Sequence, residues 1–391
     1  MVSPASATAL SAYDVSGFLS SWLKDLAVEQ RRHGTVPWYV PVIPGGPFWN
    51  PARPGAAWGD AAALTPWTLW ERYADDGVLA AQFDSARAWV DQVEQLAGPE
   101  RLWNTGIQLG DWLDPNAPPD APGEALTDRY LVATAFFARS AQRVGQTAAQ
   151  LGDAGAAAHY SALAEEVRDA FLAEWGTEPG RLRNETQTAY ALGIEFELFV
   201  DPEALTAAGE ALARLVREAD HRIGAGFAGV NLVADALSRT GHLAEAFGLL
   251  MERSTPSWLS MVDKGATTIW ERWDSLLDDG TVNSGEMTSF NHYALGSIAD
   301  WMQRVIGGLA PLAPGYRRIR FAPSPGPLSM AKARHESPYG LVFSEWSVTE
   351  GVMELRIALP LGTSGVVELP DGTRREVTPG SHRFTSTVPK R

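Results

Sequence analysis

The feature that most constrains the fold is a change in hydrophobic spacing near residue 310. Before it, apolar residues recur every three or four positions, which is typical of amphipathic helices. After about Leu312 they alternate with polar residues and are separated by Gly, Pro and Asp, which is typical of half-buried strands. We therefore predict a mainly α chain with a β-domain, divided into a helical domain at 1–309 and an antiparallel β-sandwich at 310–391. The alternating segments are 316–321, 341–346, 353–359 and 365–369.

The first region predicts about ten helices joined by loops rich in Gly and Pro. Many short helices in sequence, with functional loops between them, favour a toroid of antiparallel helix pairs around one pocket. A segment with six prolines between Pro37 and Pro54 is predicted to be non-helical. The expected helices lie near 14–31, 60–75, 78–97, 125–152, 154–175, 186–199, 202–219, 229–239, 242–252 and 289–307.

Composition excludes several classes of function. With 32 Lys and Arg against 47 Asp and Glu, the net charge of −15 argues against nucleic acid as a partner. No run of 18 apolar residues predicts a membrane span, and the first residues show no signal peptide, so we expect a cytoplasmic protein. The absence of Cys excludes disulfides, thiol catalysis and Cys-based zinc sites, and no His spacing indicates a metal, so neither metal nor cofactor is expected. Fifteen tryptophans are many, and aromatic faces are platforms for sugar rings.

The most informative stretch, 265–274, reads Gly-Ala-Thr-Thr-Ile-Trp-Glu-Arg-Trp-Asp. It places Glu271 between Trp270 and Trp273, with Arg272 next to it. Aromatic surroundings raise the pKa of a carboxylate by desolvation and a cation lowers it, so Glu271 is a candidate general base. The alternative interpretation is a surface pair of Glu271 and Arg272, with the tryptophans in the core.

Three other loops offer polar groups suited to a sugar. His292 opens the expected last helix, Asp111 and Trp112 lie together in a loop, and Asp60 precedes the expected second helix. Each has a structural alternative: His292 a core histidine, Asp60 a helix N-cap and Asp111 a turn residue. Carboxylates paired with Trp on separate loops indicate a glycosidase pocket, and we expect Glu271, Trp112, Asp60 and His292 to converge on one cavity.

Taken together, these segments resemble the bacterial α-L-rhamnosidases, which have an (α/α)6-barrel catalytic domain. The resemblance covers nearly the whole chain in the family's order. The matching segments are Tyr13-Asp-Val-Ser-Gly-Phe-Leu, Trp58-Gly-Asp-Ala-Ala, Pro66-Trp, Gly110-Asp-Trp-Leu-Asp, Thr186-Gln-Thr-Ala-Tyr-Ala, Pro256-Ser-Trp, the 265–274 stretch, Ser289-Phe-Asn-His-Tyr-Ala-Leu-Gly-Ser, Pro314-Gly-Tyr and Ser337-Pro-Tyr-Gly.

The resemblance implies hydrolysis of terminal α-L-rhamnosyl residues by an inverting single displacement, with a rhamnose-containing glycoside as substrate. Glu271 matches the family's general base. His292, Asp60 and Trp112 match positions that contact rhamnose in the −1 subsite. From the chemistry alone we add Asp111, Trp270 and Trp273 as substrate-binding candidates. Inversion requires a second carboxyl group roughly 6.5–9.5 Å from the base.

One departure from the family concerns the general acid. The family's acid is a Glu in an upstream motif that begins Asp-Cys-Pro and includes Arg-x-Glu, and this sequence has neither Cys nor that motif. The resemblance therefore implies an N-terminally truncated enzyme with the first part of its barrel missing. Two alternatives stay open: a non-catalytic protein that binds rhamnose, or a hydrolase of the same barrel type for another sugar, with Asp111 as replacement acid.

Overall fold

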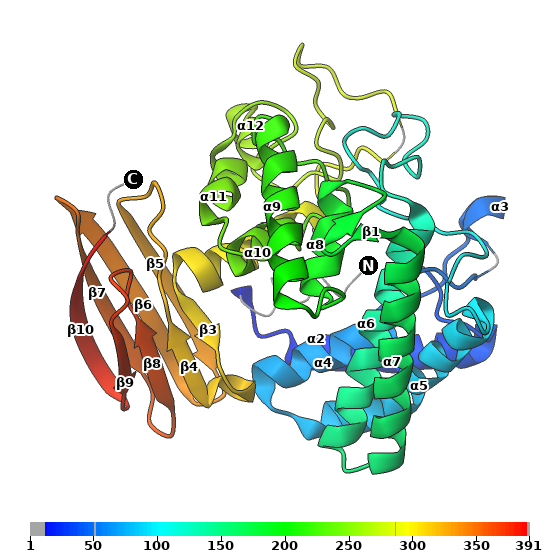
Figure 1. The fold of residues 1–391 in the computed structure, drawn as a ribbon, viewed down its shortest axis with the longest axis horizontal. Helices are drawn as coiled ribbons and strands as arrows, with labels where there is room; N and C mark the ends of the chain where they lie inside the picture. The colour runs from blue at the N-terminus through cyan, green and yellow to red at the C-terminus, as the bar shows by residue number, and fades with distance from the viewer. Residues whose placement is uncertain (1–11, 51, 286, 389–391) are drawn as a thin grey trace. The chain divides into compact units, whose positions relative to one another are not determined.

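The structure, a computed structural model, describes residues 12–50, 52–285 and 287–388 (Figure 1). Two compact units make up the described chain: the first contains residues 21–66 and 80–297, and the second contains residues 12–20, residues 67–79 and the chain from 298 onward. Residues 1–11 of the expected helical domain lie outside the described residues. The two units do not follow a single division near residue 310, and that boundary stays a prediction.

Helices dominate the chain up to residue 306, as the hydrophobic spacing predicts. Several of them begin at an N-cap side chain that accepts a backbone N–H of the first turn, namely Asp128, Asp153, Thr186 and Asp201. The helices are α2 (Ser16–His33), α3 (Gly46–Trp49), α4 (Ala61–Tyr73), α5 (Asp76–Ala97), α6 (Arg129–Gln150), α7 (Ala154–Trp175), α8 (Gln187–Glu195), α9 (Pro202–Glu218), α10 (Val233–Arg239), α11 (Leu243–Met251), α12 (Trp258–Asp263), η1 (Ala294–Ser297), α13 (Ile298–Trp301) and η2 (Met302–Ile306).

Some details of the helical region differ from the prediction. Helix α3 lies inside the proline-rich segment, where Pro47 occupies the first turn and needs no N–H partner there. Helix α12 was not expected at all, and a short hairpin of β1 (Gly176–Glu178) and β2 (Arg181–Leu182) interrupts the helices. The helix expected from residue 289 begins only at Ala294 and changes from 3₁₀ through α to π geometry.

Helices α6 and α7 form an antiparallel hairpin in the first unit (Figure 1). Helix α6 buries residues on most of its circumference, among them the neighbours Phe136 and Phe137. A helix that is apolar on several faces is a core helix. Helix α7 buries a narrower stripe that includes Leu163 and Phe171. The loop that precedes α6 supplies Leu109 and Trp112 to the pocket described below.

The second unit contains the expected C-terminal β-domain, with two four-stranded sheets. One, in the order β10-β7-β6-β5, is antiparallel throughout. The other, in the order β3-β4-β8-β9, pairs β4 with β8 in parallel, so the expectation of a purely antiparallel domain is wrong at this pair. The strands are β3 (Leu309–Pro311), β4 (Arg318–Phe321), β5 (Met330–Ser337), β6 (Gly340–Thr349), β7 (Val352–Leu359), β8 (Ser364–Glu368), β9 (Arg374–Val377) and β10 (Gly380–Thr387), with the 3₁₀ turn η3 (Pro314–Tyr316) between β3 and β4.

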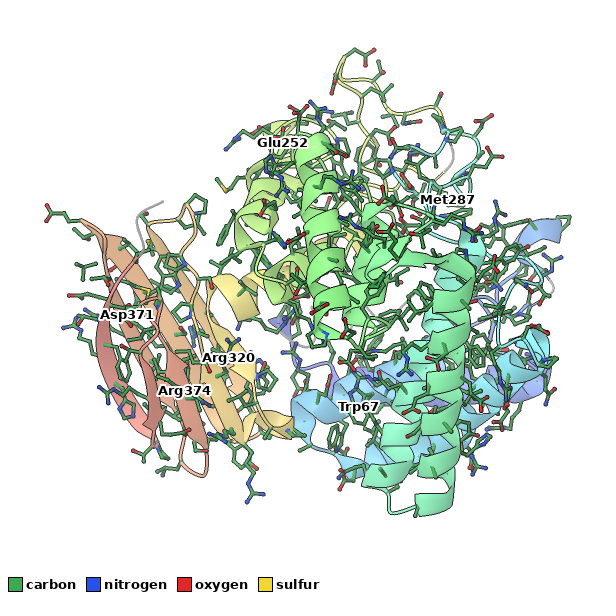
Figure 2. All side chains as sticks on the ribbon, viewed as in Figure 1. Trp67, Glu252, Met287, Arg320, Asp371 and Arg374 are labelled. Atoms are coloured by element: carbon green, nitrogen blue, oxygen red, sulfur yellow. The ribbon has the colours of Figure 1, made fainter. Side chains whose placement is uncertain are left out.

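Alternation along the strands separates the core of the β-domain from its surface. On β7, Met353, Leu355, Ile357 and Leu359 are buried and the residues between them are more exposed. On the second sheet, Figure 2 shows Arg320 and Arg374, which flank Glu368 across three strands at 2.7 and 3.7 Å. Such exposed ion pairs contribute little to stability.

Candidate active site

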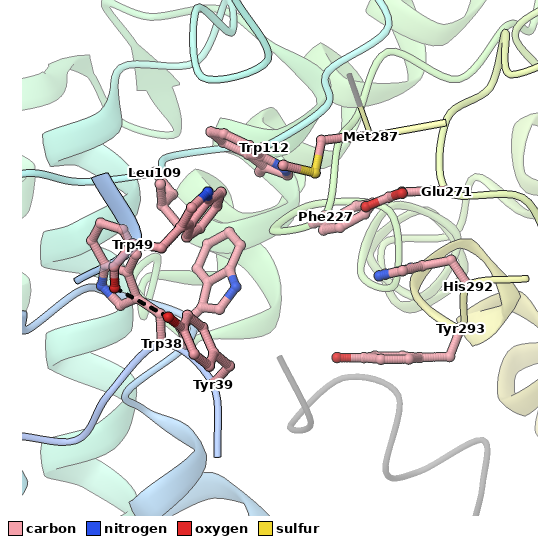
Figure 3. Close-up of a pocket in the computed structure, with 11 residues that line it drawn as sticks. Trp38, Tyr39, Trp49, Leu109, Trp112, Phe227, Glu271, Met287, His292 and Tyr293 are labelled. Carbon is pink, nitrogen blue, oxygen red and sulfur yellow. Dashed lines mark hydrogen bonds between the residues drawn. The ribbon is translucent and has the colours of Figure 1, made fainter. Parts of the chain in front are cut away.

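An open pocket of about 170 Å³ lies in the first unit, with aromatic rings on one side and a carboxylate and an imidazole on the other (Figure 3). Three of the four residues expected to converge, Glu271, Trp112 and His292, line it together. Asp60 does not line it. The lining residues are Trp38, Tyr39, Trp49, Trp58, Leu109, Trp112, Phe227, Glu271, Met287, His292 and Tyr293.

Backbone hydrogen bonds hold Glu271 and His292 beside one another. The N–H of Glu271 donates to the carbonyl of Ser289 at 2.8 Å, and the N–H of His292 donates to the carbonyl of Ile269 at 2.8 Å. The N–H of Ser289 also donates to Glu271 Oε2 at 3.1 Å. This pairing engages the backbone of residues 289–292, which is not helical, and so explains why the predicted helix begins later.

Glu271 is half-buried, and its burial raises the pKa of the carboxyl group above its ordinary value. The hydrogen bond from Ser289 and the charge of Arg272 oppose that shift. Arg272 does not pair with Glu271 as a surface ion pair, because its guanidinium donates to Asp274 at 2.9 Å. A carboxylate of raised basicity that faces a pocket is suited to accept a proton.

His292 lies between two aromatic rings. Phe227 stacks on one face with centroids 5.0 Å apart, and Tyr293 stacks on the other at 4.8 Å. Burial lowers the pKa of His292 to about 4, so the ring is neutral near pH 7. Its Nδ1 accepts the N–H of Ala294 at 3.2 Å, which assigns the proton to Nε2. Figure 3 shows the imidazole pointing into the pocket, where a neutral N–H donor suits a sugar oxygen.

The opposite wall of the pocket comes largely from the proline-rich segment, which sequence reasoning treated only as a loop. Trp38, Tyr39 and Trp49 all belong to it, and the Tyr39 hydroxyl donates to the carbonyl of Trp49 at 3.2 Å (Figure 3). Trp49 meets Trp112 edge to face at 6.1 Å. The concentration of aromatic residues among the prolines was the available signal for this wall.

Asp60 is fully buried and does not reach the pocket surface. Its carboxylate accepts hydrogen bonds from Trp89 Nε1 at 2.8 Å, Ser140 Oγ at 2.6 Å and the N–H of Ala57 at 2.7 Å. Burial raises its pKa. Because this side chain has no exposed surface, the structure does not support Asp60 as a direct sugar contact; it fixes the turn that presents Trp58 to the pocket.

Asp111 is also fully buried and does not line the pocket. Burial, followed by the charge of Asp114, raises its pKa to about 6. Its carboxylate accepts a hydrogen bond from the Thr188 hydroxyl and three from backbone N–H groups, so a sugar cannot reach it in this conformation. As a substrate contact, Asp111 is therefore not supported by the structure.

Trp270 and Trp273 are core residues and do not line the pocket. They are 3% and 2% exposed, so the expectation that they bind substrate is not supported. Trp273 donates from Nε1 to the carbonyl of Ala225 at 3.1 Å, and Trp270 meets Phe290 edge to face at 5.3 Å. Both anchor the segment that presents Glu271.

Over residues 12–50, 52–285 and 287–388, no three His, Asp or Glu side chains gather as they would around a metal ion. Within the same ranges, no helix has the length and hydropathy to cross a bilayer.

A helical domain whose loops form a pocket with aromatic rings facing a carboxylate, followed by a β-domain, defines the class of helical-barrel glycosidases. The family model of the bacterial α-L-rhamnosidase six-hairpin glycosidase domain matches residues 2–306, and that of the bacterial α-L-rhamnosidase C-terminal domain matches residues 308–384. The chain belongs to the bacterial α-L-rhamnosidase family. The expected helical fold of (α/α)6 type with a C-terminal β-domain is thereby confirmed.

Curated relatives and solved structures agree with this assignment. An α-L-rhamnosidase of Streptomyces avermitilis is 35% identical over 399 residues, which cover 97% of this chain and 37% of the relative. An α-L-rhamnosidase of Formosa agariphila is 33% identical over a match that covers 95% of this chain and 40% of the relative. The crystal structure of the Aspergillus terreus enzyme superimposes with a TM-score of 0.94 at 37% identity, covering 98% of this chain and 45% of that one. The crystal structure of the S. avermitilis enzyme in complex with L-rhamnose superimposes with a TM-score of 0.88 at 34% identity, covering 99% of this chain and 37% of that one. The chain thus spans less than half the length of these relatives.

Proposed function

We propose that this chain provides the helical barrel and the C-terminal domain, divided near residue 310, of an enzyme that removes terminal α-L-rhamnosyl residues from rhamnosides. Membership of the family supports this, as does the likeness to a relative solved in complex with L-rhamnose. The two family models meet between residues 306 and 308, close to the proposed division.

The observation that carries the proposal is the place of Glu271. Its half-buried carboxyl group, with a raised pKa, faces a wall of aromatic rings across a pocket that also holds the neutral imidazole of His292. Glu271 would take a proton from a water molecule as that water attacks the anomeric carbon, which gives inversion. Trp112 and His292 would contact the sugar.

An inverting enzyme also needs a group that protonates the leaving oxygen. Among the pocket-lining residues that the structure describes, Glu271 supplies the one carboxylate. Asp111 does not suit the role of acid, since its carboxylate is buried and already accepts four hydrogen bonds. The acid therefore has to come from outside this set of lining residues.

This requirement gives a test of the proposal on the 391-residue chain itself. The dinitrophenolate of a dinitrophenyl rhamnoside leaves without proton assistance, whereas the second sugar of a rhamnosyl disaccharide must be protonated as it leaves. We expect turnover of the first with β-L-rhamnose as the initial product by proton NMR, and much slower turnover of the second. Release of α-L-rhamnose first, or equal turnover of the two substrates, would contradict the proposed mechanism.

The described residues that line the pocket include no second carboxylate, which favours one other candidate function: a protein that binds rhamnose without cleaving it. The same experiment separates the two. Saturable binding of L-rhamnose with no hydrolysis of the dinitrophenyl rhamnoside would favour the binding protein.

A further inference from the structure

In the turn at residues 225–229, named here the Phe227 turn, three backbone N–H groups donate to one buried carboxylate, that of Asp111. The N–H groups of Gly226, Ala228 and Gly229 donate to Asp111 at 2.9, 2.9 and 3.1 Å. The Thr188 hydroxyl donates to the same carboxylate at 2.5 Å. Each oxygen of Asp111 thus accepts two hydrogen bonds, and bonds to a charged acceptor are the stronger kind.

The Phe227 turn supplies one wall of the pocket. The N–H of Phe227 donates to the carbonyl of Trp112 at 2.8 Å, which joins the turn to the neighbour of Asp111. The Phe227 ring lines the pocket and stacks on the His292 imidazole with 19° between the planes. Figure 3 shows Phe227 between Trp112 and the side chains of Glu271 and His292. The position of the imidazole therefore depends on the position of the turn.

A second anchor connects the Phe227 turn to the segment of the proposed base. Trp273, two residues after Glu271, donates from Nε1 to the carbonyl of Ala225. The turn is consequently fastened on one side by Asp111 and Trp112 and on the other by Trp273. Movement of the turn would therefore disturb both the His292 imidazole and the segment that carries Glu271.

The turn also requires a close approach of two backbones. A Cβ on Gly226 would lie 2.4 Å from the carbonyl oxygens of both Asp111 and Trp112, and a Cβ on Gly229 would lie 2.1 Å from Thr188 Oγ1. Only glycine permits such contacts. The Phe227 turn therefore packs directly against Asp111 and its neighbours, with no room for a side chain between them.

We propose that Asp111 is a positioning residue, whose carboxylate holds the Phe227 turn so that Phe227 supports the His292 imidazole and directs its Nε2–H toward the sugar. The part concerning the sugar rests on the function proposed above. Asn in place of Asp would keep the shape but turn an NH₂ group toward N–H donors. Depending on the orientation of the amide, either the bonds from Ala228 and Gly229 or the bond from Gly226 would be lost.

The experiment compares D111N with a matched control, D114N, in the 391-residue chain. Asp114 is a buried carboxylate of the same loop, but it accepts the backbone N–H groups of Asn116 and Leu126 instead of those of the Phe227 turn. A third variant, T188V, removes one donor to Asp111 without changing any charge. Two methods are used: ¹⁵N NMR gives the titration and tautomer of the His292 imidazole, with H292Q to assign the signal, and calorimetry gives the Kd for L-rhamnose.

We expect D111N to move the pKa of His292 from about 4 toward its ordinary value, since the ring loses the cover of Phe227. The Kd for L-rhamnose should rise by about tenfold or more, because the Nε2–H donor and the wall are displaced. T188V should shift both quantities less, in the same direction. D114N should leave the His292 signal as in the wild type.

Three outcomes would overturn the proposal: an unchanged His292 titration in D111N and T188V, an unchanged Kd in both, or an equal change in D114N. If circular dichroism shows that D111N has lost its fold, the His292 titration and the Kd of T188V test the proposal instead. Failure of the wild type to bind L-rhamnose would instead count against the proposed function. The His292 titration would still test whether Asp111 positions the ring.

Discussion

A buried ion cluster in the second unit gives the sharpest prediction of stability. Asp300 accepts a hydrogen bond from Arg72 at 2.6 Å and one from Arg304 at 2.6 Å, and Arg72 also donates to the hydroxyl of Tyr316 at 2.6 Å. The side chains of Arg72 and Asp300 are only 6% and 9% exposed. We predict that D300N strongly destabilises the β-domain.

The magnitude follows from burial. Breaking a buried pair by removing one partner leaves an uncompensated charge and costs about 3–5 kcal/mol. At 1.4 kcal/mol per factor of ten, the population of opened molecules should rise roughly 150- to 4,000-fold. An exposed pair in the same unit provides the control: Arg383 and Glu354 lie 3.6 Å apart, at 56% and 51% exposure, so E354Q should change that population by less than about fivefold.

The assay is hydrogen exchange of peptides that cover β6 and β7, since a chain of two units need not unfold in one step. Loss of protection in D300N within the predicted range, with E354Q close to wild type, is the expected result. Equal protection in D300N and wild type would refute the reasoning, and so would an equal loss in both variants.

Two further predictions concern the pocket and the dependence on pH. G226A should raise the Kd for L-rhamnose on the order of tenfold or more, because its Cβ forces the Phe227 turn to move. The control is G17A, whose Cβ meets nothing within 4 Å and which should bind L-rhamnose as the wild type does. Equal binding by both variants would contradict the argument. Burial, and then the charge of Arg72, lowers the pKa of His335 to about 4, so between that value and about 6.5 the unfolded chain binds more protons than the folded one. The second unit should therefore keep this contribution to stability above about pH 6.5 and lose it as the pH falls toward 4. H335Q should reduce the slope of melting temperature against pH, and an unchanged slope in that variant would count against this role of His335.

The fold was largely predictable because burial imposes a period on the sequence. The spacing in α6 and the alternation in β7 each correspond to one buried face of a regular element. Strand β5 was missed because its outward positions alternate with Ala331, Ala333 and His335, which give little hydrophobic contrast. The start of the last helical segment was misplaced because residues 289–292 pair with a distant segment, and local propensity contains no trace of that pairing.

Less of the site could be predicted. Motifs identified Glu271, Trp112 and His292, which line the pocket. The same motifs also named Asp60 and Asp111, whose carboxylates instead accept most of their hydrogen bonds from residues 29 to 118 positions away. Whether a carboxylate beside a Trp faces a cavity or a ring of donors depends on those distant partners. Trp38 and Trp49 were missed because a proline-rich loop shows no periodicity that would point its side chains in a given direction.

The central claim is that Glu271 acts as general base in a rhamnose pocket, and the most direct measurement is the turnover of E271Q on a dinitrophenyl rhamnoside, with the Kd for L-rhamnose determined alongside. The amide preserves the shape of the side chain and removes its basicity. The account predicts that kcat falls by roughly 10²- to 10⁴-fold while the Kd stays within about twofold of the wild type. An unchanged kcat with intact binding would remove Glu271 from the reaction and contradict the account.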